Sequence, residues 1–418
     1  MQQVEHKARL RAVGLYLAAV QLCFALGWVI YAIYLPELAQ RVGLERHWVP
    51  WILALDQLVF ICTDLAVGVW SDRAAAIQGR IARWVLGATL LSTAAFLLLP
   101  WAASGASPGL FLGLTVLWAA TSAALRAPPL TLLGRYVPRP MQPTLIALSM
   151  LGLGLASAAA PYLGLQLKAI DPRWPFALSA LVLAAVTLGM VAAERSLARP
   201  AGAARPDPVR PGVTAPAAAA TAGAARMPQA GAVFLVVCAL AALSFQVHVF
   251  LSSTPLYLRH ATRAELPALL PVFWIGFNLA LWPASVLARR IGAPRALAMG
   301  AVAAAFGVSA AHLAPSLQLL IASQALAGAA WALVLCSAFA SALSFGHSGR
   351  EGLFSGSLQS ILALGALSRL MVLLLLAPSA AQQLAWAGAP ALVFALAALL
   401  LVAALSRAKG WPAPTPAS

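Results

Sequence analysis

The amino-acid sequence predicts an all-α membrane protein with twelve transmembrane helices arranged as two pseudo-symmetric six-helix bundles. Three observations lead to this prediction. The 418 residues are 62% hydrophobic and 9% charged, which leaves too little polar surface to cover a water-soluble globule. Apolar stretches of about 20 residues recur along the chain, each long enough to cross about 30 Å of hydrocarbon as a helix. A polar segment divides these stretches into two sets of six.

The apolar stretches set the boundaries of the predicted helices. Each is about twice as long as the strand of a membrane β-barrel, and a helix satisfies its own backbone hydrogen bonds in lipid. The first stretch has too long an apolar core for a cleaved signal peptide, so we expect it to be retained. The predicted spans are residues 13–35, 49–70, 84–101, 109–133, 144–167, 174–193, 231–254, 267–287, 296–314, 317–343, 353–376 and 384–405.

Basic residues are concentrated on one side of this predicted topology. With the N-terminus inside, most of the 27 Lys and Arg residues fall on the cytoplasmic side, and six fall outside: Arg41, Arg46, Lys168, Arg173, Arg259 and Arg263. This positive-inside bias predicts a multi-pass protein with both termini in the cytoplasm. The formal net charge of +16 therefore indicates topology rather than nucleic-acid binding. The excess of Arg over Lys and the abundant Ala indicate a GC-rich bacterial genome, and hence the bacterial inner (plasma) membrane.

Cysteine usage and motif content argue against a metal centre or an enzyme. The four cysteines, Cys23, Cys62, Cys238 and Cys336, lie in four different predicted spans, so neither a disulfide framework nor metal-ligand spacing is indicated. The sequence contains no Gly-rich nucleotide loop, nucleophile elbow or His/Glu metal motif. We therefore predict no enzymatic activity, no metal and no cofactor.

Two similar halves flank a polar linker. Residues 199–230 are rich in Pro, Ala and Gly and are predicted to be a disordered cytoplasmic linker between an N-terminal bundle, 1–198, and a C-terminal bundle, 231–418. The halves echo each other. The residues after the second span correspond loosely to Ser285, Arg289, Arg290 and Gly292 after the eighth. A repeated six-helix half suggests a pseudo-twofold transporter that rocks about a midplane site.

The loop between the second and third spans carries a motif. Gly68, Asp72 and Arg73 are followed, after five residues, by Gly79 and Arg80, which is four residues more than in the signature given below. With the twelve spans and the central linker, this loop resembles the major facilitator superfamily, whose signature there is G-x-x-x-D-R-x-G-R-R. The resemblance covers nearly the whole chain. It implies the major facilitator fold and transport by alternating access.

The longer spacing of this loop resembles a particular branch of the superfamily, the melibiose-type glycoside-pentoside-hexuronide:cation symporters. Asp64 before the first glycine and Trp84 after the second fit that pattern. Two positions depart from it. Leu65 stands where a proline is common, and Phe60 stands where an aspartate is expected.

The motif residues are predicted to form a cytoplasmic latch. Gly68 allows a neighbouring helix to approach closely, and Asp72 is placed to meet the positive N-terminus of a facing helix. Arg73, Gly79 and Arg80 complete the predicted latch, with the arginines reaching acidic or carbonyl partners. The alternative is a basic loop that only sets the membrane topology.

Four ionic side chains fall inside predicted spans, where a charge is costly and is usually paired or faces a wet cavity. Asp56 and Asp64 lie about 80° apart on the second span and so point to one broad side. Asp56 and Arg369 are each about seven residues, or roughly 10 Å, from the outer end of their spans. The resemblance implies that these two spans face each other between the halves. We hypothesise that Asp56 and Arg369 form an ion pair that closes the periplasmic side when the cavity faces inward.

Asp64 and Arg126 lie in the cytoplasmic half of the first bundle, where they could form a second pair. Protonation of either aspartate would weaken its pair and bias a two-state equilibrium, which suggests coupling to protons. The alternative is that the two pairs are purely structural.

The resemblance implies that spans one, four, seven and ten line the substrate cavity. Amphipathic aromatic residues with a few amides suit a small organic molecule with polar groups. Each residue taken singly is also consistent with packing, and His248 is in addition a candidate proton carrier because its unperturbed pKa is near neutrality. The candidates are Gln21, Trp28 and Tyr31, then Trp118, Thr121 and Ser122, then Gln246 and His248, and finally Gln324 and Trp331.

These features predict a secondary active transporter for a small organic solute. The expected partners are that solute, a coupling proton rather than sodium, and the lipid bilayer, with the protein acting as a monomer. Uptake is favoured because the Gly-rich signature that the exporter subfamilies carry in the fifth span is degraded here to Ala160-Pro161, and two buried aspartates without a carboxylate cluster favour protons as the coupling ion. The alternatives are a proton-driven drug or metabolite efflux antiporter and, from another class, a non-transporting sensor or a lipid flippase on the same fold.

Overall fold

The computed structural model describes residues 2–78, 81–105, 107–198, 229–347, 349–407 and 411. Within these residues, twelve helical segments are long and apolar enough to cross a membrane, and each coincides with a predicted span. The predicted linker lies outside the described residues except for Gln229 and Ala230, which begin a helix. Gly79 and Arg80 of the predicted latch also lie outside them.

Six membrane segments form the N-terminal bundle. The first three are nearly continuous helices, whereas the fourth and sixth are each divided into two. The helices are α1 (Gln2–Arg41), α2 (Val49–Gln78), α3 (Ala82–Gly105), α4 (Pro108–Ser122) with α5 (Pro128–Tyr136), α6 (Gln142–Gln166), and α7 (Arg173–Thr187) with α8 (Met190–Ala198).

The C-terminal bundle repeats this arrangement. Its first segment contains a π-helical turn, His248–Ser252, between two α-helices. The helices are α9 (Gln229–Val247) with α10 (Ser253–Tyr257), α11 (Leu266–Leu269) with α12 (Pro271–Ile291), α13 (Ala293–Leu313), α14 (Leu317–Gly346), α15 (Glu351–Leu376), and α16 (Ala380–Ala385) followed by α17 (Ala389–Ser406).

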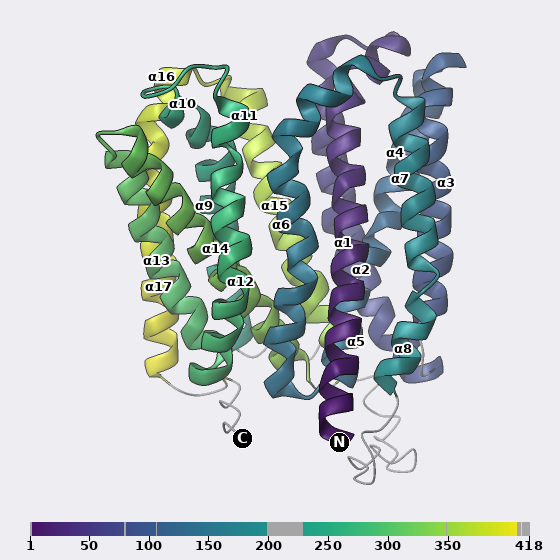
Figure 1. Cartoon of the computed structure of the whole chain (residues 1–418), viewed down its shortest axis with the longest axis vertical. Helices are drawn as coiled ribbons and strands as arrows, with labels where there is room; N and C mark the ends of the chain where they lie inside the picture. Colours follow the sequence, from purple (N-terminus) through teal and green to yellow (C-terminus); the bar gives the residue numbers. More distant parts are fainter. Residues whose placement is uncertain are drawn as a thin grey trace.

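The two bundles stand side by side and meet along two pairs of helices. In Figure 1, α1–α8 and α9–α17 form separate groups, and the start of α1 and the end of α17 lie at the bottom. We call that end the terminal face and the other end the opposite face. Across the junction, α2 packs against α15 and α6 packs against α12. Each pair joins the second membrane segment of one half to the fifth segment of the other half, as expected for a pseudo-twofold arrangement.

Close helix packing depends on small residues. A side chain at Gly152 of α6 would collide with the Ala18 carbonyl of α1, and one at Gly328 of α14 would collide with the Phe273 carbonyl of α12. Because lipid gives little hydrophobic drive between helices, such close backbone contact provides the packing energy. These two glycines therefore act at helix crossings.

The fourth membrane segment is interrupted where its sequence reads Ala127-Pro128-Pro129. A short 3-10 turn, Ala123–Leu125, ends α4, and α5 begins at Pro128. Pro128 and Pro129 lack a backbone N–H and cannot donate to the turn before them, so the break follows from the sequence. Backbone groups freed here need other partners, because lipid offers none.

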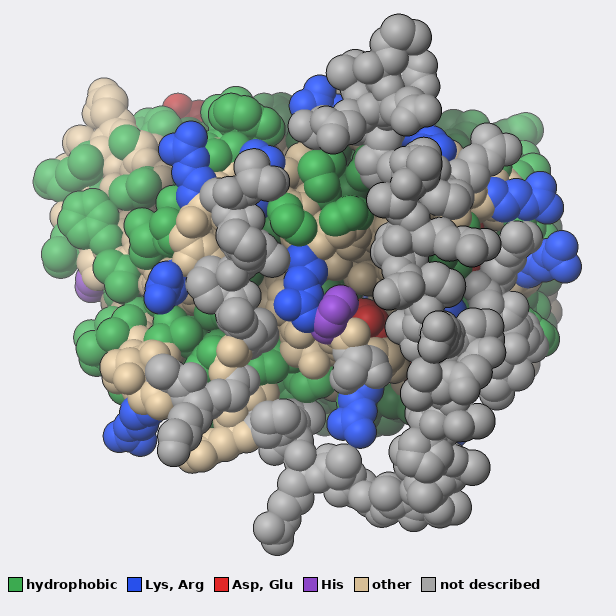
Figure 2. Space-filling model, turned by 90° about the horizontal axis from the view of Figure 1, so that it is seen from below, with side chains coloured by type: hydrophobic (Ala, Val, Ile, Leu, Met, Phe, Trp, Pro, Cys, Tyr) green, Lys and Arg blue, Asp and Glu red, His purple; other side chains and the backbone are tan. Residues whose placement is uncertain are grey.

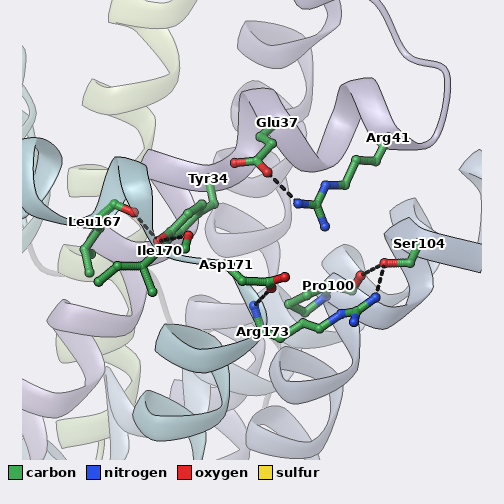
Figure 3. Close-up of polar contacts among 9 residues, drawn as sticks. All are labelled: Tyr34, Glu37, Arg41, Pro100, Ser104, Leu167, Ile170, Asp171 and Arg173. Carbon is green, nitrogen blue, oxygen red and sulfur yellow. Dashed lines mark hydrogen bonds and ion pairs between the residues drawn. The ribbon is translucent and has the colours of Figure 1, made fainter.

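The surfaces of the molecule match a membrane setting. Leu279, Leu392 and Trp174 point outward and are 76%, 75% and 74% exposed, as lipid-facing side chains should be. Figure 2, which views the terminal face, shows Lys and Arg side chains distributed around it. On the opposite face, Tyr34 and Arg173 tie helices together through hydrogen bonds to backbone carbonyls and to Ser104 (Figure 3). There the Tyr34 hydroxyl of α1 donates to the carbonyls of Leu167 and Ile170, and Arg173 donates to Ser104.

Candidate functional site

Asp72 joins the two bundles at the terminal face. Its carboxylate oxygens accept hydrogen bonds from the backbone N–H groups of Gly352, at 2.7 Å, and Leu353, at 2.8 Å. These groups belong to the first turn of α15, where helix N–H groups lack intrahelical partners and the dipole is positive. The structure thus contains the contact that the sequence predicted for Asp72, a carboxylate on the N-terminus of a facing helix.

Three glycines, Gly68, Gly352 and Gly356, bring α2 and α15 together at this contact and further into the membrane. A Cβ atom at Gly68 would meet the carbonyl oxygen of Gly352, and one at Gly356 would meet the carbonyl of Asp64. The backbones of the two helices are therefore in direct contact. Further along, the Ser360 hydroxyl donates to the carbonyl of Ile61 at 2.8 Å. Gly68 lies where the predicted latch requires it, at a close crossing of the two bundles.

The remaining latch residues contribute less to this junction. Arg73 is exposed on the terminal face, and Trp84 lies on the outside of the bundle in an edge-to-face contact with Trp70. Sequence reasoning missed Glu194 of α8, whose buried carboxylate accepts from the N–H groups of Ile81 and Ala82 at 3.0 and 3.1 Å. This contact caps α3 directly after the loop. A lone carboxylate at the end of a span was the available signal.

Asp64 and Arg126 form an ion pair at the junction of the bundles. The Arg126 Nη2 atom lies 3.1 Å from Asp64 Oδ2, and the two side chains are 15% and 0% exposed. The guanidinium also lies over the Phe60 ring, 4.3 Å from its centre. Neither Asp64 oxygen makes an aligned hydrogen bond with a described residue, so the contact is ionic and not directional. The pair suggested by the sequence is present in the structure.

The helix break that carries Arg126 is held by two glutamines. Gln21 of α1 donates to the Leu125 carbonyl at 2.8 Å, and Gln359 of α15 donates to the Arg126 carbonyl at 3.4 Å. The Arg126 guanidinium donates in turn to the Gln359 side-chain oxygen at 3.5 Å. These amides satisfy carbonyls that the break frees. Gln359 was not predicted, because a single glutamine in a span gives no periodic signal.

A cavity of about 80 Å³ adjoins Arg126 between the bundles. We call it the interbundle cavity. Its polar lining comes from Gln21, Arg126, Ser149 and Gln359, and the rest is apolar. Helices α1, α5, α6, α14 and α15 contribute the other lining residues, which are Leu17, Pro129, Leu130, Leu133, Met150, Leu153, Leu335, Phe339 and Leu362. Of the ten predicted substrate contacts, Gln21 lines this cavity.

The predicted ion pair between Asp56 and Arg369 is absent from the described conformation. Asp56 accepts a hydrogen bond from the Tyr31 hydroxyl at 2.9 Å, inside the N-terminal bundle. Arg369 lies over the Phe250 ring, 4.7 Å from its centre. The turn of about 80° between Asp56 and Asp64 explains the difference, since it directs Asp64 to the junction and Asp56 toward α1. The α2–α15 contacts described above lie nearer the terminal face than either residue.

Predicted cavity residues of the N-terminal bundle form an aromatic cluster. Trp28 lies 5.4 Å from Tyr31 and 5.0 Å from Trp118, measured between ring centres. Tyr31 and Trp118 are buried. The hydroxyls of Thr121 and Ser122 donate to carbonyls of their own helix turn. These residues therefore pack the bundle instead of lining the interbundle cavity.

The C-terminal bundle holds a second buried cluster. The Phe245 and Trp331 rings stack at 4.2 Å, and His248 shares a hydrogen bond of 3.0 Å with the Gln324 side-chain oxygen. His248 begins the π-helical turn and is buried. Gln246, half-buried in the turn before it, does not line the interbundle cavity either. The described conformation thus places these candidates inside the second bundle.

Comparisons with known proteins agree with this architecture. The sequence profile of the Major Facilitator Superfamily matches residues 17–368. A search of curated proteins returns no match.

Several solved structures are similar in fold. A bacterial homologue of the iron transporter ferroportin, in its outward-facing state, has a TM-score of 0.70 and 13% identity over 94% of this chain and 100% of its own. The human organic anion transporter MFSD10 has a TM-score of 0.66 and 16% identity over 94% and 99%. The Escherichia coli fucose:proton symporter FucP has a TM-score of 0.66 and 13% identity over 94% and 98%. From its twelve spans, its two bundles and the profile match, the chain belongs to the Major Facilitator Superfamily of membrane transporters, which are not enzymes.

Proposed function

We propose that the protein is a secondary active transporter that takes up a small organic solute by alternating access, coupled to protons. The observation that carries this proposal is the Asp64–Arg126 ion pair. It lies inside the membrane span, at the junction of two bundles, next to the interbundle cavity. A buried pair of this kind is poorly explained by stability, because desolvation offsets most of the attraction. It is well suited to a step in which one partner gains a proton.

The orientation follows from charge. We assign the basic terminal face to the cytoplasm of a bacterial cell, by the positive-inside bias, and the opposite face to the periplasm. The contact of Asp72 with α15 then closes the cytoplasmic side. Alternating access requires this contact to open. A carboxylate held by two N–H groups and by glycine packing is a reversible closure, since few side chains must be rearranged to release it.

Proton coupling works through the charge of Asp64. While ionised, Asp64 pairs with Arg126 and fixes the helix break against α2. Protonation removes the attraction and frees the guanidinium. A proton then changes the relative free energies of the two conformations, which is the requirement for coupling. One of the structures similar in fold is the fucose:proton symporter FucP, which agrees with a proton as the coupling ion.

Reconstituted protein provides the test. A thermal-shift screen of sugars, carboxylates, amino acids and drugs at two pH values first identifies a solute that stabilises the purified protein. That solute is then added outside liposomes that contain a pH-sensitive dye and a clamped membrane potential. We expect the lumen to acidify as labelled solute enters, and an acidic exterior to drive accumulation.

Two variants sharpen this test. Asp64→Asn is expected to keep solute exchange across the membrane but to lose accumulation driven by the pH gradient. Asp171→Asn removes an exposed carboxylate on the opposite face and serves as the matched control, with unchanged accumulation. Alkalinisation of the lumen would indicate an efflux antiporter instead. If solute enters without any proton movement, coupling to protons is wrong, and if no solute crosses, transport itself is wrong.

A further inference from the structure

We propose that Arg126 binds the carboxylate of an anionic substrate, which replaces Asp64 on the guanidinium when Asp64 accepts a proton. This inference rests on the proposed function, since it takes the interbundle cavity as the transport site. It adds the chemical class of the substrate and the residue that recognises it.

The donors of Arg126 are incompletely used. A guanidinium carries five N–H donors in a planar fork that matches two carboxylate oxygens. Here one nitrogen lies 3.1 Å from Asp64 without an aligned hydrogen bond, and its contact with Gln359 is long, at 3.5 Å. The buried Nε atom has no hydrogen-bond partner among the described residues. The fork is therefore available for a bidentate anion in a low-dielectric site, where such a contact is strong.

The lining of the interbundle cavity selects for an anion with a short apolar chain. Among the described residues that line the cavity, Arg126 alone carries a charge, and Gln21, Ser149 and Gln359 add uncharged polar groups. A cationic solute would meet the guanidinium without a lining carboxylate to balance it. A volume of about 80 Å³ is several times the roughly 10–15 Å³ that one water needs on the same measure, so the cavity has room for a carboxylate with a short chain.

The exchange conserves charge at the site. In the resting pair, Asp64 carries one negative charge and Arg126 one positive charge. When one proton binds Asp64 and one carboxylate binds Arg126, the site is again neutral. No bond other than the new O–H bond forms, and the carboxylate takes the place of Asp64 as the counter-ion. The bundles then rock without carrying a net charge through the bilayer, which would be costly.

The surroundings of Asp64 leave Arg126 as its charged partner. From α15, the groups that face this part of α2 are the uncharged Gly356, Gln359 and Ser360. The charged groups Glu351 of α15 and Arg135 of α5 lie nearer the terminal face, where they act on Asp72. Asp72 itself is held by the first turn of α15. Titration of Asp64 therefore acts on Arg126 more directly than on the other ionic groups that the structure describes.

Binding assays on the purified protein test this inference without a membrane gradient. The probes are straight-chain monocarboxylates of two to six carbons and the primary amides of the same acids. We expect the acids, and not the amides, to raise the melting temperature, with a stronger effect at lower pH. Asp64→Asn should bind the acids about tenfold tighter at neutral pH or above, and with little pH dependence, because Arg126 has lost its competitor.

Removal of the guanidinium gives the complementary result. Arg126→Gln should abolish acid binding. The double variant Asp64→Asn with Arg126→Gln removes both charges together, so it stays informative if the single variant fails to fold. Arg259→Gln, on the opposite face, is the matched control with unchanged binding.

The outcomes separate this inference from the proposed function. Amides that stabilise the protein as well as the acids would overturn it, and so would Asp64→Asn binding the acids no tighter than the unmodified protein. If sugars or amides are then transported with protons, the proposed function still stands. Acid binding that depends on Arg126 without any transport would leave the binding site intact and defeat the proposed function.

Discussion

The contact between α2 and α15 can be compared with the contact between α12 and α6, which joins the same bundles on the other side of the pseudo-twofold axis. In the first, Asp72 accepts two backbone hydrogen bonds and three glycines bring the helices into backbone contact. In the second, Gly154 of α6 meets Phe277 and Asn278 of α12. A cavity of about 170 Å³ lies along this second contact, lined mostly by apolar side chains.

The repeat explains why the two contacts differ. Asp72 corresponds to Arg289 of α12, and an arginine cannot accept hydrogen bonds from a helix N-terminus. The first turn of α6, which corresponds to that of α15, also has one N–H group fewer to satisfy, because Pro143 lies in it. Under the proposed function, the symmetric fold therefore contains one closure that charge controls and one contact that depends on packing. Changes at the first should shift the conformation, whereas changes at the second should alter stability.

The largest effect is expected from Gly352→Leu, which prevents the backbone contact. A side chain there would collide with the Gly68 carbonyl and approach Ser71 and Asp72. Overpacking of this kind costs about 3 kcal/mol, enough to change the ratio of closed to open states about 150-fold. Spin labels at positions 195 and 407 in a cysteine-free protein should report a longer distance across the terminal face. An unchanged distance would mean that this contact does not close the face.

Asp72→Asn should have the next largest effect. The amide keeps one acceptor oxygen but loses the charge that favours the α15 N-terminus, which is worth about 1.4 kcal/mol, or a tenfold shift toward the open state. The same spin-label distance measures it. Asp72→Glu serves as a control that keeps the charge and tests whether reach matters. If the Asn variant stays as closed as the unmodified protein, the two hydrogen bonds are incidental to closure.

Asn278→Leu tests whether the α6–α12 contact affects stability without affecting the conformation. The Asn278 amide oxygen is buried without a hydrogen-bond partner among the described residues, and its amide nitrogen donates within its own helix to Trp274. Replacing it with an apolar side chain of similar size is expected to stabilise the protein by about 1 kcal/mol. Thermal unfolding in detergent measures this gain, while the spin-label distance should not move. A shifted distance would show that α6 and α12 also control the conformation.

Arg289→Gln should have the smallest effect. Arg289 is exposed at the terminal face and occupies the position that corresponds to Asp72. Surface substitutions of this kind change stability by about 0.5 kcal/mol or less. Neither the melting temperature nor the spin-label distance should change measurably. A clear opening of the terminal face would indicate that both halves carry a charge-controlled closure.

The sequence predicted the elements and part of the site. All twelve spans were predicted because long apolar runs are forced to be helical in lipid. Asp72 and the Asp64–Arg126 pair were found because ions beside or inside a membrane span are few and need partners. Gln359 and Glu194 were missed, since their partners are backbone groups far away in the chain. Such pairings leave no pattern in the sequence, although the lone carboxylate of Glu194 at the end of a span was itself a signal.

The amino-acid sequence by itself determined the twelve membrane spans, the two-bundle architecture and which ionic side chains lie inside the spans, because hydrophobicity and the cost of buried ions act locally. The tertiary structure decided which of those ions meet. Asp56 accepts a hydrogen bond from Tyr31, whereas Asp64 pairs with Arg126, although the two aspartates lie on one helix. A rotation of about 80° around α2 separates the interior of a bundle from the junction between bundles. That assignment depends on how the neighbouring helices pack, which no local pattern specifies.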